Sequence, residues 1–167
     1  MNKKTNNNSK LLIILAIFVF VTAVILLYIN PIMNSERSAS NIISKVTDRD
    51  IVIPIDEVTE TPSFYPATIN GTDLEIIAVK ASDGTIRTAF NTCQVCYSSG
   101  RGYYKTEGDR LVCQNCGNSF SVDEVEVTRG GCNPVPITPE YKTIDDKTII
   151  ITKDFLNKAT EIFHNWK

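Results

Sequence analysis

Hydrophobic residues in this chain form one long uninterrupted run, followed by several short runs separated by polar residues. The long run covers residues 11–29, LLIILAIFVFVTAVILLYI, and contains nineteen residues without a charge. A helix of this length spans roughly 28 Å at about 1.5 Å per residue, which matches a hydrocarbon core of about 30 Å. The pattern therefore predicts a single N-terminal transmembrane helix at residues 11–30.

The residues that flank this run predict its orientation. Lys3, Lys4 and Lys10 precede it, and no acidic residue does. Because basic flanks stay in the cytoplasm, we expect residues 1–10 to be a cytoplasmic N-terminus and the rest of the chain to be extracytoplasmic. A cleaved signal peptide is the alternative, but its apolar stretch is usually about 7–15 residues long. The length of the run favours an uncleaved, single-pass anchor in the cell membrane.

A polar stretch separates this anchor from the remainder of the chain. Residues 34–50, NSERSASNIISKVTDRD, lack a sustained hydrophobic period, which is typical of a linker. We therefore expect a juxtamembrane linker at residues 31–50. Residues 51–167 are enough for one compact domain and too few for two comfortable ones.

The short hydrophobic runs predict a domain that is mainly β. Each is rich in β-branched or alternating apolar residues and is bounded by Gly, Asp, Asn or Pro, which is the pattern of short strands. The expected strands are residues 51–55, 74–81, 85–90, 110–112, 119–122 and 148–152. The last segment differs, because apolar residues recur at helical spacing over residues 155–166 after Asp154, a candidate N-cap. We expect this C-terminal helix to pack on the sheet.

Charge and composition exclude several classes of function. Apart from the three lysines before the anchor, the chain has fourteen basic and nineteen acidic residues, a net charge of −5. No basic stripe offers a surface for phosphates, so nucleic acid is not an expected partner. Patterns typical of Ser–His–Asp triads, paired catalytic carboxylates and phosphate-binding loops are also missing. These features favour a redox or metal-binding component without enzymatic activity of its own.

Four cysteines carry the strongest chemical signal. Cys93, Cys96, Cys113 and Cys116 form a C-x2-C-x16-C-x2-C array, in which each pair can present two sulfurs to one ion from a tight turn. Gly117 follows the second pair and can adopt the positive φ that such a turn needs. The array predicts a metal ion or an iron–sulfur cluster bound by all four sulfurs. Two disulfides or a dithiol redox site are the alternatives.

Cys132 is a fifth cysteine outside this array. It lies in RGGCNPVPI, where two glycines permit close backbone approach and two prolines stiffen the exit. An odd thiol in an oxidising compartment is usually paired, reactive or buried. The sequence leaves two interpretations open for Cys132, a direct role in metal binding and a packed structural thiol.

The motifs CxxCY, GRGY, LVCxNCGxxF and RGGCNPVPI occur in this order between about residues 74 and 151. Together they resemble the signature of the membrane iron–sulfur-containing, FtrD-like family, whose members accompany bacterial iron-uptake systems. The resemblance implies a membrane-tethered domain in which Cys93, Cys96, Cys113 and Cys116 bind an iron–sulfur centre. It also implies a role in electron transfer or iron handling beside a membrane permease or a redox partner.

The same segment is more distantly similar to a Rieske-type domain, in which two loops hold the cluster. Rieske loops supply one Cys and one His each, whereas here Cys96 and Cys116 stand where histidines would be expected. Four thiolates also suit Zn²⁺, so a small Rieske-like or zinc-ribbon-like β domain is expected. Two functions stay open: an electron-transfer or iron-handling module, and a zinc-stapled domain for protein contacts with no redox role.

Overall fold

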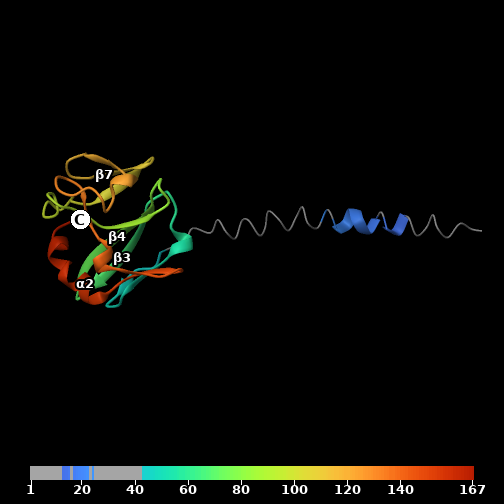
Figure 1. Cartoon of the computed structure of the whole chain (residues 1–167), viewed down its shortest axis with the longest axis horizontal. Coiled ribbons are helices and arrows are strands. Elements are labelled where there is room, and N and C mark those ends of the chain that lie inside the picture. The colour runs from blue at the N-terminus through green and yellow to red at the C-terminus, as the bar shows by residue number, and fades with distance from the viewer. Residues whose placement is uncertain (1–12, 16, 23, 25–42) are drawn as a thin grey trace, which may run out of the picture. The chain divides into compact units, whose positions relative to one another are not determined.

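The computed structural model describes residues 13–15, 17–22, 24 and 43–167. The chain divides into an N-terminal unit that ends at Ile42 and a folded unit, Ile43–Lys167 (Figure 1). In the N-terminal unit the described residues are helical, and no helix within the described part of the chain is both long and apolar enough to cross a membrane. The predicted cytoplasmic segment at residues 1–10 lies outside the described residues, as does much of the predicted anchor at 11–30 and linker at 31–50.

The folded unit consists mainly of β-strands with one short α-helix, which confirms the predicted fold class at this level. The strands are β1 (Val46–Thr47), β2 (Ile51–Pro54), β3 (Ser63–Ile69), β4 (Thr72–Lys80), β5 (Ile86–Cys93), β6 (Tyr104–Glu107), β7 (Arg110–Cys113), β8 (Ser119–Ser121), β9 (Pro134–Pro136), β10 (Thr143–Ile144) and β11 (Thr148–Ile151). The helices are α2 (Lys153–Lys158) and the 3-10 turns η1 (Ile55–Glu57), η2 (Val122–Glu124), η3 (Pro139–Tyr141) and η4 (Thr160–Phe163).

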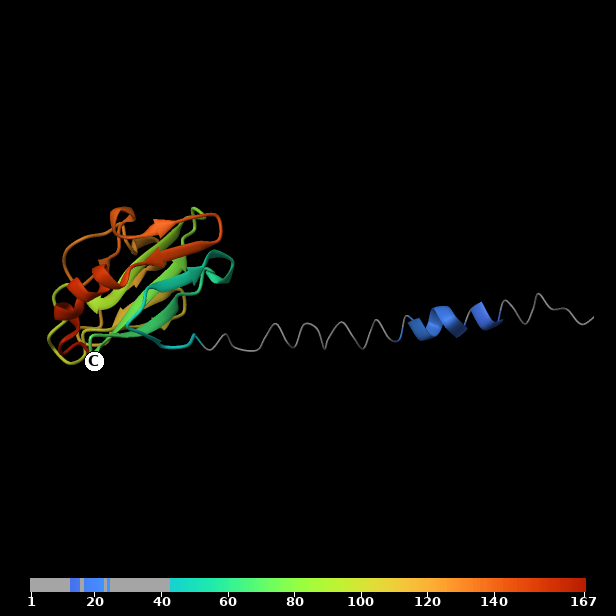
Figure 2. The same ribbon diagram turned by 90° about the horizontal axis from the view of Figure 1, so that it is seen from below.

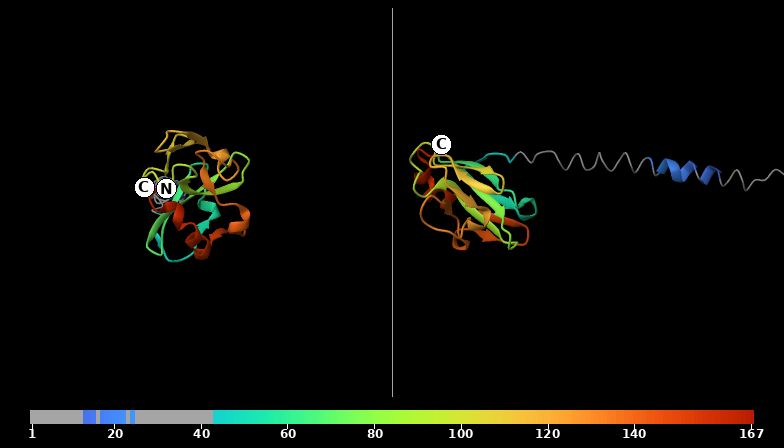
Figure 3. Two further views of the ribbon diagram at one scale, coloured as in Figure 1. Left: turned by 90° about the vertical axis from the view of Figure 1, so that its left-hand side faces the viewer. Right: turned by 90° about the horizontal axis from the view of Figure 1, so that it is seen from above.

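Three sheets make up the folded unit. The central sheet has the strand order β1-β3-β4-β5-β9, and two smaller sheets have the orders β10-β11-β2 and β6-β7-β8. In Figure 1 β7 lies at the opposite end of the unit from α2, with β3 and β4 between them, and the left panel of Figure 3 shows the same arrangement from the side. Figure 2 shows the red C-terminal helical segments beside the green strands of the central sheet.

The central strands bury both of their faces, which explains the nearly continuous apolar sequence of β4. Leu74 and Ile76 belong to one hydrophobic core, whereas Ile77 and Val79 point to a second core on the opposite face. Because successive strand residues point to opposite faces, this alternation requires a cover on each side of the sheet.

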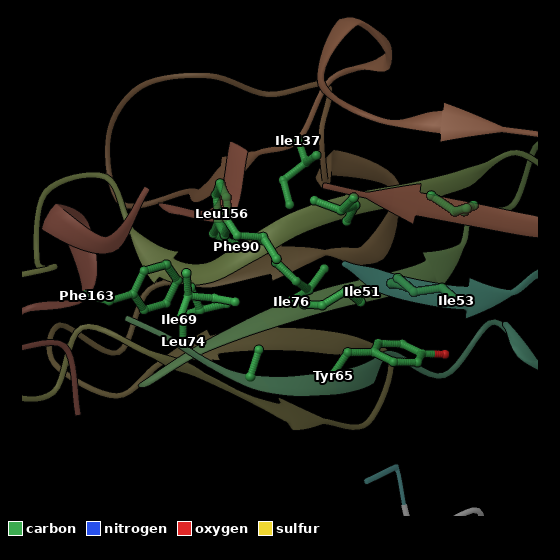
Figure 4. Close-up of a cluster of buried hydrophobic side chains, with 14 of the residues drawn as sticks. Ile51, Ile53, Tyr65, Ile69, Leu74, Ile76, Phe90, Ile137, Leu156 and Phe163 are labelled. Atoms are coloured by element: carbon green, nitrogen blue, oxygen red, sulfur yellow. The ribbon is translucent and has the colours of Figure 1, made fainter. Parts of the chain in front are cut away.

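The larger core lies between the central sheet, the β10-β11-β2 sheet and the C-terminal helical segments. Figure 4 shows its side chains gathered from strands and helices far apart in sequence, among them Ile51, Phe90, Leu156 and Phe163. Phe90 meets the Phe163 ring edge-on at a centroid distance of 5.6 Å. Each such buried side chain contributes about 1.5–3 kcal/mol relative to exposure, so burial of these side chains makes a large contribution to stability.

The smaller core lies between the other face of the central sheet and the β6-β7-β8 sheet. Its buried members include Tyr104, Leu111 and Val125 together with Cys93, Cys96 and Cys113. Three of the predicted ligands are therefore also part of a hydrophobic core.

The folded unit begins at Ile43, before the predicted domain start at residue 51. The reason is β1, which pairs in parallel with β3 through Val46↔Ala67 and Thr47↔Thr68. The polar sequence around β1 carries no strand pattern of its own, so the last residues of the predicted linker at 31–50 are ordered by pairing with β3.

The sequence also did not predict β3, β6, β9 and β10, and two of these strands, β3 and β9, contain proline. Proline lacks an N–H and is confined to sheet edges or irregular positions. Pro134 and Pro136 lie in β9, which is an edge strand of the central sheet. Pro66 lies in β3 beside the end of the short β1, whose pairing starts only at Ala67.

The C-terminal helix differs from its prediction in both its start and its length. Thr152 is the N-cap in place of Asp154, and its hydroxyl accepts a hydrogen bond from the Phe155 N–H at 3.4 Å. The α-helix ends at Lys158 and continues as η4, a 3-10 turn. The tighter turn still carries the expected apolar side inward, since Leu156, Phe163 and Trp166 are buried.

A buried ion pair ties the loop after η2 to the central sheet. The Lys142 ammonium donates to the Glu126 carboxylate, and their side chains are 1% and 13% exposed. Lys142 also donates to the Thr88 hydroxyl at 2.9 Å, while the Thr88 N–H donates to Glu126 at 2.8 Å. Glu126 adopts a positive φ of 67°, which is unfavourable for a side chain of this kind and is held in place by these contacts.

We expect Lys142→Met to lower the free energy of unfolding by about 3–5 kcal/mol, because it leaves the Glu126 carboxylate buried without its partner. The matched control is Lys153→Met, which removes an exposed partner of Asp48 whose side chains are 37% and 46% exposed. That control should cost at most about 1 kcal/mol. Denaturant unfolding of both variants measures the difference, and equal losses would contradict a stabilising role for the buried pair.

Candidate metal centre

The first cysteine loop follows directly from β5. Cys93 is the last residue of that strand, and the chain then turns so that the Cys96 N–H donates to the Cys93 sulfur at 3.2 Å. The Cys93 N–H donates to the Gly102 carbonyl at 2.7 Å, which closes the loop at its base. A Cβ at position 102 would lie 2.2 Å from the Cys96 carbonyl oxygen. Only glycine fits there, which explains the second glycine of the GRGY motif.

The second cysteine loop joins β7 to β8. Cys113 ends β7, and its carbonyl accepts a hydrogen bond from the Gly117 N–H at 2.9 Å. Gly117 has a φ of +74°, as its place after the second cysteine pair predicted. The Gln114 N–H donates to the Tyr103 carbonyl at 2.8 Å, so the second loop is bonded to the end of the first.

Residues near the C-terminal helical segments hold the first loop from the other side. The Gly100 N–H donates to the Asn165 carbonyl at 2.6 Å, and the Asn165 amide donates to the Ser98 carbonyl at 2.8 Å. The Thr92 hydroxyl donates to the Ile162 carbonyl at 3.2 Å. The loop between the strands is therefore fixed at both of its ends.

All five cysteine sulfurs converge on one place. Those of Cys93, Cys96 and Cys132 lie within 4.8 Å of one another, and so do those of Cys96, Cys113 and Cys116. Cys96 belongs to both groups of three. Cys93, Cys96 and Cys113 are buried, Cys132 is partly buried and Cys116 is exposed.

Cys132, which the sequence left open, lies within reach of the predicted ligands. Its sulfur is 3.9 Å from the Cys96 sulfur. The Tyr104 hydroxyl donates to the Cys132 carbonyl oxygen, and the Tyr104 ring meets Phe120 edge-on at 6.0 Å between centroids. All five cysteines are free thiols in residues 43–167, so the structure contains neither of the disulfides considered as an alternative.

Backbone N–H groups lower the pKa of a cysteine thiol at this site, whereas burial raises it. Burial raises the pKa of the Cys93 thiol, but the N–H groups of Cys96 and Val95 outweigh it, and the pKa is lowered. In the second loop, burial opposes the Asn118 N–H and the neighbouring sulfurs, and the pKa of Cys116 is also lowered. Each loop thus favours one thiolate, the form that binds metals.

The remaining thiols stay protonated more readily. Burial raises the pKa of Cys113 to about 12 and also raises that of Cys96. The interaction with the Cys116 sulfur, followed by burial, raises the pKa of Cys132 to about 12. A bound cation would reverse these shifts, because coordination deprotonates a thiol.

These residues fit a thiophilic metal. The donor set in each group is sulfur alone, which suits Zn²⁺ or iron–sulfur centres. Two sulfurs on one tetrahedral ion with bonds of about 2.3 Å would lie about 3.8 Å apart, and the separation of the Cys96 and Cys132 sulfurs is 3.9 Å. The spacing of this pair is therefore that of two sulfurs on one common ion.

The sequence pattern did not mark Gln94, which matters to the geometry of the site. The Gln94 side chain accepts from the Gly130 N–H at 3.1 Å and donates to the Pro134 carbonyl at 3.2 Å, so it holds the Cys132 loop on both sides. The Tyr104 hydroxyl holds the Cys132 carbonyl. A glutamine between the two cysteines of the first pair carries no pattern that marks such contacts in advance.

Comparison with known families agrees with this geometry. A family described as membrane iron-sulfur containing protein FtrD-like matches residues 58–163, a span that contains all five cysteines. No curated protein and no solved structure significantly matches the chain. Because the match covers more than half of the 167 residues, the chain belongs to the FtrD-like family of membrane iron–sulfur-containing proteins.

Proposed function

We propose that the folded unit binds an iron–sulfur centre through Cys93, Cys96, Cys113 and Cys116 and serves in electron transfer or iron handling. The observation that carries this proposal is the convergence of all the cysteine sulfurs in two groups that share Cys96. The description of the family as iron–sulfur containing supports the identity of the bound group. The centre would supply one-electron chemistry, since its iron changes oxidation state.

The protein's own residues would shield the site and leave it accessible at one edge. Tyr104 and Cys113 are 1% exposed and keep water from the inner side. Cys116 is exposed, so a partner can approach the sulfurs from that side. A site that is buried except at one ligand suits electron transfer, because the surroundings control the potential while the exposed edge stays close to the partner.

The alternative is a zinc-stapled domain for protein contacts with no redox role. The specific observation that favours it is the sulfur separation of 3.9 Å between Cys96 and Cys132, which is near that expected for two sulfurs on a single tetrahedral ion. In this case the metal would only hold the two loops and the smaller core together.

The two loops also support the finer description of the fold as Rieske-like or zinc-ribbon-like. One loop follows β5 and the other joins β7 to β8 in a small antiparallel sheet. Both fold types hold their metal between two such loops. The departure from Rieske domains is the replacement of both histidines by Cys96 and Cys116.

We further propose that a single helix at residues 11–30 anchors this domain on the outer side of the cell membrane. The uncharged run and its basic flank support the span and its orientation, and the family is described as a membrane family. An anchored metal domain would meet a permease or a redox partner in the same membrane, in keeping with a link to iron uptake.

The full chain, purified without oxygen, should contain iron and acid-labile sulfide and absorb visible light. Cys113→Ser should remove the metal and make the domain sensitive to protease, because apparent binding energies of about 10–16 kcal/mol are known for structural metal sites. The matched control is Ser99→Ala in the first loop, which leaves every sulfur in place. A colourless protein with one zinc per chain and no sulfide would replace the iron–sulfur proposal with the zinc-stapled one.

Protease added to intact cells whose outer barrier has been removed should digest residues 43–167, because the proposed topology leaves them outside the membrane. A tag placed before Lys3 should stay protected until the cells are lysed. Resistance of the domain before lysis would mean that the orientation is reversed. A shortened chain released into the medium would mean that the N-terminal segment is cleaved.

A further inference from the structure

We propose that Cys116 and Cys132 are alternative ligands of one metal site, so that Cys93, Cys96 and Cys113 are fixed and the fourth position is exchanged between two sulfurs. This inference rests on the proposed metal-binding function and goes beyond it, because it assigns a role to the fifth cysteine. Five sulfurs converge where a tetrahedral site needs four.

The burial of the cysteines distinguishes the proposed fixed ligands from the proposed exchangeable ones. The three proposed fixed ligands are at most 8% exposed. Cys116 is exposed and Cys132 is partly buried, so both lie on the outer side of the site. A buried sulfur held in a core cannot withdraw from the site without opening that core, whereas an outer sulfur can.

Both outer sulfurs are within reach of the same inner ligand. Cys132 and Cys116 each lie within 4.8 Å of the Cys96 sulfur, in different groups of three. Each outer sulfur can therefore join Cys96 at the site, Cys132 together with Cys93 and Cys116 together with Cys113.

The loop of Cys132 is held against the first cysteine loop by a dedicated clamp. The Gln94 N–H donates to the Asn133 carbonyl at 3.1 Å, and the Gln94 side chain bonds to Gly130 and Pro134. The Asn133 side chain closes the turn by donating to the Gly130 carbonyl at 2.6 Å. Residues on both sides of Cys132 are thus fixed to a residue between Cys93 and Cys96, which a merely packed thiol would not require.

The exchange is chemically balanced without an oxidant or a reductant. If the Cys132 thiol bound the metal, its proton would pass to the departing Cys116 thiolate, and the reverse would occur when Cys116 returned. One sulfur bond to the metal would form as another broke, and no electron would move. Withdrawal of the exposed Cys116 would leave the outer side of the site open to an incoming ligand from a partner, which suits the handling of a metal that must be passed on.

The test is alkylation of the metal-loaded full chain. The protein is purified without oxygen with its own metal and treated with iodoacetamide, and the labelled cysteines are identified by peptide mass. We expect one label per chain, divided between Cys116 and Cys132, with Cys93, Cys96 and Cys113 unlabelled. Cys116→Ser and Cys132→Ser should each keep the metal and take up no label. The double variant should keep less than about a tenth of the metal, since only three sulfurs remain.

Two further variants serve as a control for the loop and as a test of the Gln94 hydrogen bonds. Val127→Ser changes an exposed residue in the same loop and should leave both metal content and labelling as in the natural chain. Gln94→Ala removes the side-chain clamp and should move the label toward Cys132, because its loop is then released from the site. An unchanged division of label in Gln94→Ala would show that the clamp does not position Cys132.

Other labelling results would contradict the proposed exchange of Cys116 and Cys132. Label on Cys132 alone, with loss of metal in Cys116→Ser, would overturn the exchange and leave the site of four paired cysteines intact. Label on Cys116 alone would make Cys132 a fixed ligand, and no label at all would mean that five sulfurs are bound, so both results also overturn the exchange. Label on all five cysteines of a protein that contains no metal would overturn the proposed function itself.

Discussion

The burial of both faces of the central sheet is the constraint on which the rest of the structure depends. β4 and β5 send alternate side chains into two separate cores, and an apolar strand face left in water would cost about 25 cal/mol for each Å² exposed. The larger core is covered by the β10-β11-β2 sheet and the helical segments. The small β6-β7-β8 sheet covers the other face, and its connections carry the cysteines. The cysteine cluster therefore also lies in the part of the fold that closes the second core.

Because the cysteines belong both to this cluster and to the smaller core, burial and backbone hydrogen bonds both act on their sulfurs. Cys93 and Cys113 end strands whose apolar residues continue into the smaller core. Burial alone would keep their thiols protonated, and backbone N–H groups within the tight turns oppose that effect. The exposed Cys116 has less burial to overcome. The site combines inner sulfurs held by packing with outer sulfurs held by loops.

The sequence predicted the features that depend on the local pattern of residues, and it missed those that depend on contacts between distant residues. The short apolar and β-branched runs of β4 and β5 and the two-residue spacing of each cysteine pair are local, and the structure contains the strands and brings the sulfurs together. β3 and β9 contain prolines that are tolerated only because of their neighbours in the sheet. Cys132 reaches the site through the hydrogen bonds of Gln94 to residues more than thirty positions away. No short segment of the sequence contains both residues of such a contact, so a local pattern cannot predict it.

The hydrogen bonds that join Asn165 with Gly100 and Ser98, and Thr92 with Ile162, can form only late in biosynthesis. Chains are made and exported from the N-terminus, and contacts between distant residues form only when both have emerged. All five cysteines therefore leave the ribosome before residues 162–165, which complete the fixation of the first loop. A nascent chain would expose five reactive thiols during this interval, and a chain that stops before residue 162 would keep them exposed. A truncated product would therefore be open to oxidation and degradation.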